Sequence, residues 1–93
     1  MSTTIVARRF RVRGRVQGVG FRYFVQCEAV RLKLDGWVRN LDSGEVELHA
    51  QGQPAALDEL AGALHRGPRF ADVRGVEPVE AAVLKYQGFR IVS

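Results

Sequence analysis

The chain has 93 residues, of which 46% are hydrophobic and 26% charged, and it contains a single cysteine. These proportions are typical of a globular protein and exclude a disordered tail, and the length fits one domain, which we place at residues 1–93. One cysteine excludes an intrachain disulfide and a four-thiolate metal site. Because the sequence has neither a secretory signal nor a run long enough to cross a membrane, we expect a soluble cytoplasmic protein.

Arginine dominates the positive charge of the chain. Lys and Arg number 14 against 10 Asp and Glu, which gives a formal net charge of +4, and only Lys33 and Lys85 are lysines. A guanidinium offers a planar fork of donors that matches phosphate or carboxylate oxygens, so the bias favours an anionic ligand. The same bias also occurs as a compositional habit without function, and composition alone leaves both interpretations open.

The first half of the chain predicts a strand, a helix and a hairpin. Partly alternating apolar residues predict a strand over Ile5–Arg13, and apolar residues at spacings of three and four predict a helix over Phe21–Leu34. Two short runs on either side of an Asp-Ser-Gly turn, Gly36–Leu41 and Glu45–Ala50, predict a β-hairpin.

The second half predicts a helix and a strand, with a further short strand at the end. Pro54 suits the first turn of a helix that Gly67 ends, Asp72–Glu80 predicts a strand, and Phe89–Val92 allows another. The order strand, helix, strand, strand, helix, strand predicts an α+β ferredoxin-like βαββαβ sandwich, with an antiparallel sheet that carries both helices on one face. This fold serves enzymes and binding modules alike, so it does not decide function.

A glycine-rich stretch, "GRVQGVGFR", joins the first predicted strand to the first predicted helix. Its glycines, which include Gly18 and Gly20, let the backbone aim successive amides at one point, and Arg22 places a guanidinium where the helix begins. Together these groups predict a site for a tetrahedral oxyanion. The alternative is a tight connection with Arg22 in solvent. Neither the nucleotide-binding loop nor the cysteine-phosphatase loop matches, because no Lys follows the last glycine and no Cys precedes Arg22.

Asn40 ends the first strand of the predicted hairpin. Its neutral amide can accept a hydrogen bond from a water molecule, but it cannot remove a proton at neutral pH. Asparagine is also favoured before turns, so a role in the turn is the alternative.

These two segments carry a resemblance to a known family. The stretches "VRGRVQGVGFR" and "GWVRNLDSGEVELHAQG" look like the signature motifs of the acylphosphatases, and the resemblance extends to the "LKYQGFRI" ending. It implies that Arg22 binds the phosphoryl group and that Asn40 positions the attacking water. It also implies that the loop amides surround the phosphate; the loop residues are Arg15, Val16, Gln17, Gly18, Val19 and Gly20.

The resemblance implies hydrolysis of small acyl phosphates by a monomer with no metal and no organic cofactor, and phosphate or sulfate as the anion most readily bound. An acyl phosphate releases a carboxylate, the conjugate base of an acid with a pKa of about 4, so no general acid is needed. Positioning and electrostatic stabilisation then suffice. We expect the proton of the water to pass to a phosphoryl oxygen of the substrate.

The remaining polar and aromatic residues favour structural roles. We expect Cys27 to pack as a small hydrophobic residue, His49 and His65 to be packed or solvated, and Trp37 to pack in the hairpin core rather than line the site. The arginines on and after the first strand predict a solvated strand face, with attraction of dianionic substrates as the alternative; they are Arg8, Arg9, Arg11, Arg13 and Arg15.

Two other classes of function compete with hydrolysis. The net charge of +4 is compatible with nucleic-acid binding, but the segment "EVELHA" offers no aromatic residue on which bases could stack, so we expect no nucleic acid partner. The second rival is a module that handles carbamoyl phosphate, or a binder, detached from a larger maturation protein; Arg22 and Asn40 could serve either role.

Overall fold

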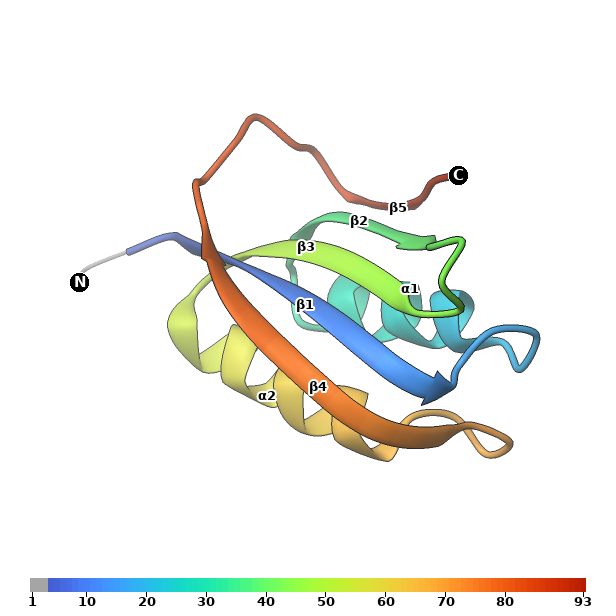
Figure 1. Ribbon diagram of the computed structural model, residues 1–93. Coiled ribbons are helices and arrows are strands. Elements are labelled where there is room, and N and C mark those ends of the chain that lie inside the picture. The colour runs from blue at the N-terminus through green and yellow to red at the C-terminus, as the bar shows by residue number, and fades with distance from the viewer. Residues whose placement is uncertain (1–3) are drawn as a thin grey trace.

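The computed structural model describes residues 4–93, in which two helices cover one face of a five-stranded sheet (Figure 1). The elements in chain order are β1 (Val6–Arg15), α1 (Phe21–Arg31), β2 (Asp35–Asn40), β3 (Val46–Gly52), α2 (Pro54–Arg66), β4 (Asp72–Ala81) and β5 (Phe89–Ile91). This arrangement confirms the predicted ferredoxin-like α+β sandwich.

The strand order is β4-β1-β3-β2-β5. The pairs β1–β3, β1–β4 and β2–β3 are antiparallel, as predicted. The short additional strand also forms, but β5 pairs in parallel with β2, so the sheet as a whole is mixed. The reason is that the chain leaves β4 at one edge and crosses to the other edge before it turns back, which gives β5 the direction of β2.

A single hydrophobic core lies between the sheet and the helices. Side chains that alternate along the strands meet the apolar stripes of both helices, and the core includes Phe10, Val12, Phe21, Val25, Ala29, Val38, Val46, Leu48, Leu57, Leu60, Leu64 and Phe89. Burying a side chain of the size of Val, Leu or Phe contributes roughly 1.5–3 kcal/mol. The core therefore fixes α1 against β2 and β5, the elements that bear the candidate site.

Helix α1 ends at Arg31, three residues before the predicted boundary. Lys33 has a left-handed backbone (φ 59°), and the amide of Leu34 donates to the carbonyl of Ala29 at 2.9 Å. These are features of a Schellman motif, in which the residue after the cap is usually glycine. With a lysine in that place, the sequence carried no signal for the end of the helix.

The Schellman turn sends β2 back alongside α1. An 11-residue helix rises about 16 Å, and a strand of 6 residues spans about 20 Å. Because the two elements run in opposite directions and have similar lengths, the start of α1 and the end of β2 lie at the same end of the molecule. This arrangement brings Arg22 and Asn40 together although 18 positions separate them.

Two expectations about packing are wrong. Cys27 is exposed on α1 and is not packed. Trp37 is outside the core and lies half-buried on the face of the sheet opposite the helices, since alternation along β2 directs Val38 inward and Trp37 outward. His49 is fully buried on that same outer face, and His65 is exposed.

Within residues 4–93, neither helix is both long and apolar enough to cross a membrane.

Candidate active site

The loop between β1 and α1 is bent by two glycines in left-handed conformation. Gly18 has φ 75° and Gly20 has φ 79°, and a Cβ atom built at either would meet no atom within 4 Å. Backbone conformation rather than space therefore requires glycine at these positions. Gly20 is the N-cap of α1 and supplies no capping side chain, so the amides of the first turn remain available to a ligand.

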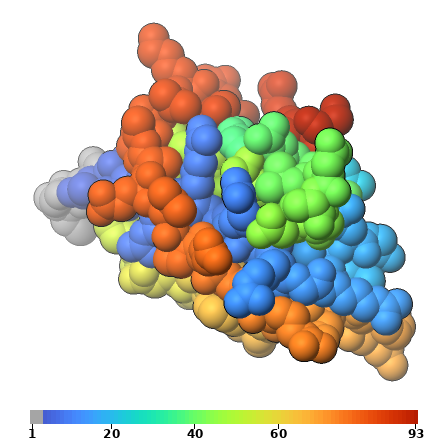
Figure 2. Space-filling model, in the orientation of Figure 1, coloured from blue at the N-terminus to red at the C-terminus, as the bar shows by residue number. Residues whose placement is uncertain are grey.

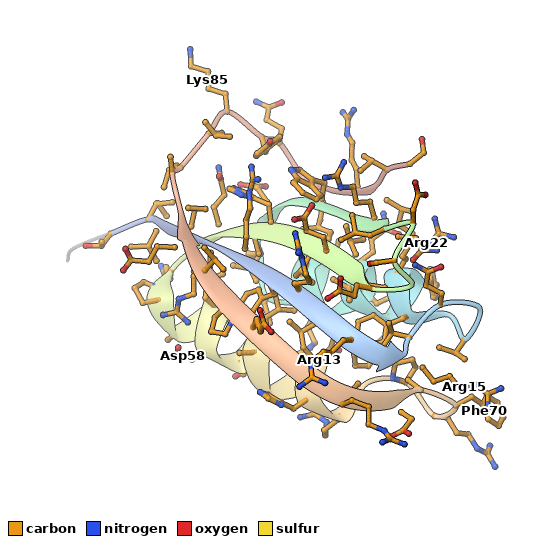
Figure 3. All side chains as sticks on the ribbon, viewed as in Figure 1. Arg13, Arg15, Arg22, Asp58, Phe70 and Lys85 are labelled. Carbon is orange, nitrogen blue, oxygen red and sulfur yellow. The ribbon has the colours of Figure 1, made fainter. Side chains whose placement is uncertain are left out.

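Arg22 is the second residue of α1, and its side chain is exposed at the end of the sheet (Figure 3). Within residues 4–93 no carboxylate forms an ion pair with its guanidinium. The amino-terminal end of a helix carries about half a positive charge, so a cation there is unfavourable until an anion joins it. Arg22 and the first turn of α1 therefore generate positive potential in the same small region.

A hollow of about 190 Å³ opens at this end of the sheet. The residues that line it come from the loop, α1, β2 and β5, and none of them is acidic: Val16, Gly18, Gly20, Phe21, Arg22, Tyr23, Asn40 and Ile91. This volume is below the roughly 300–1,000 Å³ of sites for drug-sized ligands, which suits a small group. The hollow can therefore accept a small anion.

Asn40 contributes a buried polar atom with no hydrogen-bond partner among residues 4–93, its Oδ1. An unsatisfied buried acceptor costs about 1–3 kcal/mol, and a native protein rarely keeps one without a reason. The turn that follows is closed by other groups, since the amide of Leu41 donates to the carbonyl of Glu45 at 2.8 Å and that of Gly44 to Leu41 at 3.1 Å. The Asn40 side chain is thus free to accept a hydrogen bond from a ligand or a water molecule.

Gln17 joins the loop to the turn that follows Asn40. Its Nε2 donates to the carbonyl of Leu41 at 2.8 Å and to that of Glu45 at 2.9 Å. Both protons of the amide are used, and the side chain is half-buried. One side chain therefore fixes the loop of residues 16–20 against the end of β2.

Tyr23 forms an exposed wall of the hollow beside Arg22, with 66% of its surface accessible. A hydrogen bond with the Cys27 side chain, one helical turn further on, raises the pKa of the Tyr23 phenol above its usual value. The phenol is therefore neutral near pH 7 and adds no negative charge to the hollow.

The predicted site residues do not all face the hollow. Arg22, Asn40, Val16, Gly18 and Gly20 line it. The Gln17 side chain instead binds the turn, Val19 packs partly against the core, and Figure 3 shows Arg15 near Phe70, apart from Arg22.

Sequence analysis missed three lining residues. Phe21 and Tyr23 flank Arg22 in the sequence, and this adjacency was the only local signal for them. Ile91 comes from the other end of the chain, so only knowledge of the β2–β5 pairing could have placed it.

Within residues 4–93, no group of three or more His, Cys, Asp or Glu side chains could hold a metal ion.

The fold and this hollow define a class of protein, a ferredoxin-like sandwich with a basic anion pocket at one end of its sheet. The family model for acylphosphatase matches residues 8–91, and the chain belongs to the acylphosphatase family. A curated acylphosphatase of Solibacter usitatus is 61% identical over 85 residues, which are 91% of this chain and 88% of that protein. The chain is therefore an enzyme of this family.

Two solved structures have the same fold. The crystal structure of acylphosphatase from Bacillus subtilis superposes with a TM-score of 0.91 at 44% identity, over 97% of this chain and 100% of that one. A crystal structure of full-length HypF, described as its phosphate- and nucleotide-bound form, superposes with a TM-score of 0.94 at 30% identity, over 100% of this chain and 12% of that one.

Proposed function

We propose that this chain hydrolyses the carboxyl–phosphate bond of small acyl phosphates, with Arg22 and the loop amides binding the phosphoryl group and Asn40 positioning the water. One observation carries the proposal: among residues 4–93, a guanidinium without an ion pair, glycine-bent amides and an amide oxygen without a hydrogen-bond partner line the same hollow, and no carboxylate lines it. Membership of the acylphosphatase family supports the reaction. Phosphate or sulfate is the simple anion that such a site should hold.

Arg22 supplies the charge in the proposed reaction. Its fork of donors can hold two phosphoryl oxygens at once, while the amides of the loop and of the first turn of α1 contact the others. These donors are already oriented before substrate arrives, so they offset the charge on the equatorial oxygens without reorganising.

Asn40 orients the nucleophile. Its Oδ1 accepts a hydrogen bond from a water molecule and holds the oxygen of that water in line behind phosphorus. The water oxygen forms a bond to phosphorus as the bond from phosphorus to the carboxylate oxygen breaks, and the proton of the water moves to a phosphoryl oxygen. The products are a carboxylate and inorganic phosphate, and no protein group needs to lose or gain a proton.

The oligomeric state, the domain bounds, the location and the absence of a cofactor are also proposals. We propose that the protein acts as a monomer. The family match over residues 8–91 supports a single domain, which we place at residues 1–93, and we propose a cytoplasmic location and no cofactor.

A second candidate function is a module that handles carbamoyl phosphate. The superposition with HypF supports the idea of a module, since the whole of this chain corresponds to 12% of that protein. Carbamoyl phosphate is itself a mixed anhydride of phosphate, so the same hollow could receive it. A preference for carbamoyl phosphate over benzoyl phosphate would favour this second candidate.

The function is tested by incubating the purified chain with benzoyl phosphate, carbamoyl phosphate and a simple phosphate monoester, each with a metal chelator. We expect release of phosphate from the mixed anhydrides only, at a rate that the chelator does not change. Hydrolysis of the monoester, or loss of activity with chelator, would contradict the proposal.

Replacing Arg22 tests the phosphate-binding role. Arg22→Ala should abolish both inorganic phosphate binding and turnover, and Arg22→Lys should restore neither, because a point charge replaces a bidentate fork. The measurements are competitive inhibition by phosphate and steady-state kinetics. Arg31→Ala, which removes the same charge from the far end of α1, is the matched control and should keep activity.

Replacing Asn40 should separate binding from turnover. Asn40→Ala should lower kcat by about 10²-fold or more, as for other lost transition-state hydrogen bonds, and should leave the inhibition constant of phosphate nearly unchanged. If phosphate binding fell instead and kcat stayed constant, Asn40 would be a binding residue and not a water-positioning one.

Gln17 is proposed as a positioning residue that acts through Asn40. Gln17→Leu removes both bonds to the turn, and we expect kcat to fall about tenfold in the wild-type background and not at all in the Asn40→Ala background. Gln26→Leu is the matched control, because the Gln26 amide also donates to a backbone carbonyl, that of Phe89 at 3.0 Å. A tenfold loss that persists after Asn40→Ala would show that Gln17 acts in some other way.

A further inference from the structure

Aromatic and arginine side chains gather around Trp37 on the outer face of the sheet, opposite the helices. The guanidinium carbons of Arg9 and Arg39 lie 5.4 and 5.3 Å from the centre of the Trp37 ring. The His49 ring lies nearly parallel to it at 6.1 Å, with 18° between the planes. The Trp37 Nε1 donates to the Tyr86 hydroxyl at 3.1 Å. Two arginines, a histidine and a tyrosine therefore fix the position of the Trp37 ring.

The segment of residues 82–88 crosses from β4 to β5 and is fixed to this face. The Gln51 side chain binds both backbone groups of Leu84, accepting from its amide at 3.0 Å and donating to its carbonyl. Gly88 donates to the Asp35 carboxylate at 2.8 Å and accepts from the Gly36 amide at 2.9 Å. The segment is therefore bound to the sheet at two points, Leu84 and Gly88.

A hollow of about 730 Å³ lies between this segment and β5, and we call it the outer hollow. Gly36, Trp37, Lys85, Tyr86, Gln87, Arg90 and Val92 line it. In Figure 2 residues 82–88 and the last residues of the chain stand apart at the upper edge of the molecule, with a notch between them. Its volume lies within the range of about 300–1,000 Å³ typical of small-molecule sites.

The outer hollow is positively charged. Lys85 and Arg90 line it, no lining residue is acidic, and neither cation has an ion pair among residues 4–93. Arg90 lies beside Trp37 in the β2–β5 register. Figure 3 shows Lys85 at the apex of the segment with its side chain directed away from the sheet, and its flexible stem allows the ammonium to swing toward the hollow.

Two carboxylates on this face, Asp35 and Glu47, are already bound by other groups, and Asp35 accepts from the Gly88 amide at 2.8 Å. Glu47 binds Arg39 at 2.8 Å and Arg11 at 3.4 Å. Burial alone would raise the pKa of Glu47, but the hydrogen bonds and charges of Arg39 and Arg11 outweigh it and hold the pKa below its usual value. Glu47 therefore cancels charge on Arg39 and Arg11, and among residues 4–93 neither Glu47 nor Asp35 forms an ion pair with Arg90.

We propose that the outer hollow binds a small phosphorylated molecule with a planar ring, of the class of a nucleoside monophosphate. Tyr86 offers apolar ring surface to the base, Gln87 offers an amide to its edge, and Arg90 with Lys85 offers donors to the phosphate. A single-stranded nucleic acid is disfavoured, because Arg9 and Arg39 already cover the ring of Trp37 and leave no row of exposed rings for successive bases.

Trp37 is the only tryptophan of the chain, so its fluorescence reports directly on this hollow. Adenosine monophosphate should change the fluorescence in a saturable way, with a dissociation constant below about 1 mM. Adenosine alone and inorganic phosphate alone should each bind at least tenfold more weakly. Saturating inorganic phosphate should not displace the nucleotide, because the phosphate occupies the hollow at Arg22.

Paired variants test the charges. The double variant Lys85→Gln and Arg90→Gln should weaken nucleotide binding at least tenfold, while Arg66→Gln and Arg69→Gln, which remove the same charge elsewhere, should not. Hydrolysis of benzoyl phosphate should be unchanged in both double variants, so this test stands independently of the proposed function.

Three results would overturn the proposal. They are the absence of a saturable change up to about 10 mM nucleotide, an equal loss of affinity in both double variants, and displacement of the nucleotide by inorganic phosphate. Tighter binding of an oligonucleotide than of the mononucleotide would assign the surface to nucleic acid instead.

Discussion

The candidate site depends on a positively charged side chain at a place in the fold where positive charge is unfavourable. Arg22 puts a guanidinium at the end of α1 where the helix itself is positive, and the cost is roughly 0.3–1 kcal/mol for an exposed charge. No carboxylate within residues 4–93 pairs with Arg22. Only an anion from outside removes this repulsion. Binding of an anion should therefore recover the free energy that the placement of Arg22 costs the folded chain.

The rest of the fold holds that arrangement in place. Helix α1 and strand β2 are joined by a tight turn and run in opposite directions, which sets the start of one beside the end of the other. The core fixes their separation, and Gln17 fixes the loop to the turn that follows Asn40. The two faces of the sheet then have separate characters, an apolar inner face that carries the helices and a basic, aromatic outer face.

Much of this could be predicted from sequence because the decisive signals were local. Apolar periodicity and turn residues gave the elements, and the glycine loop with Arg22 and the position of Asn40 gave the site residues that meet in one hollow. What was missed at the site depends on contacts between distant segments: Ile91 in the wall of the hollow and the bonds from Gln17 to the turn. The end of α1 was missed for another reason, since Lys33 occupies a backbone conformation that normally signals itself with glycine.

The composition of the hollow has a consequence for acidity. A guanidinium, a carboxamide and backbone amides have no proton to exchange near neutrality, and the raised pKa of Tyr23 keeps its phenol from doing so. A catalyst built in this way has no ionisation of its own in the physiological range. In the proposed reaction, any dependence of the rate on acidity between about pH 5 and 8 then reflects the protonation of the substrate's own phosphate.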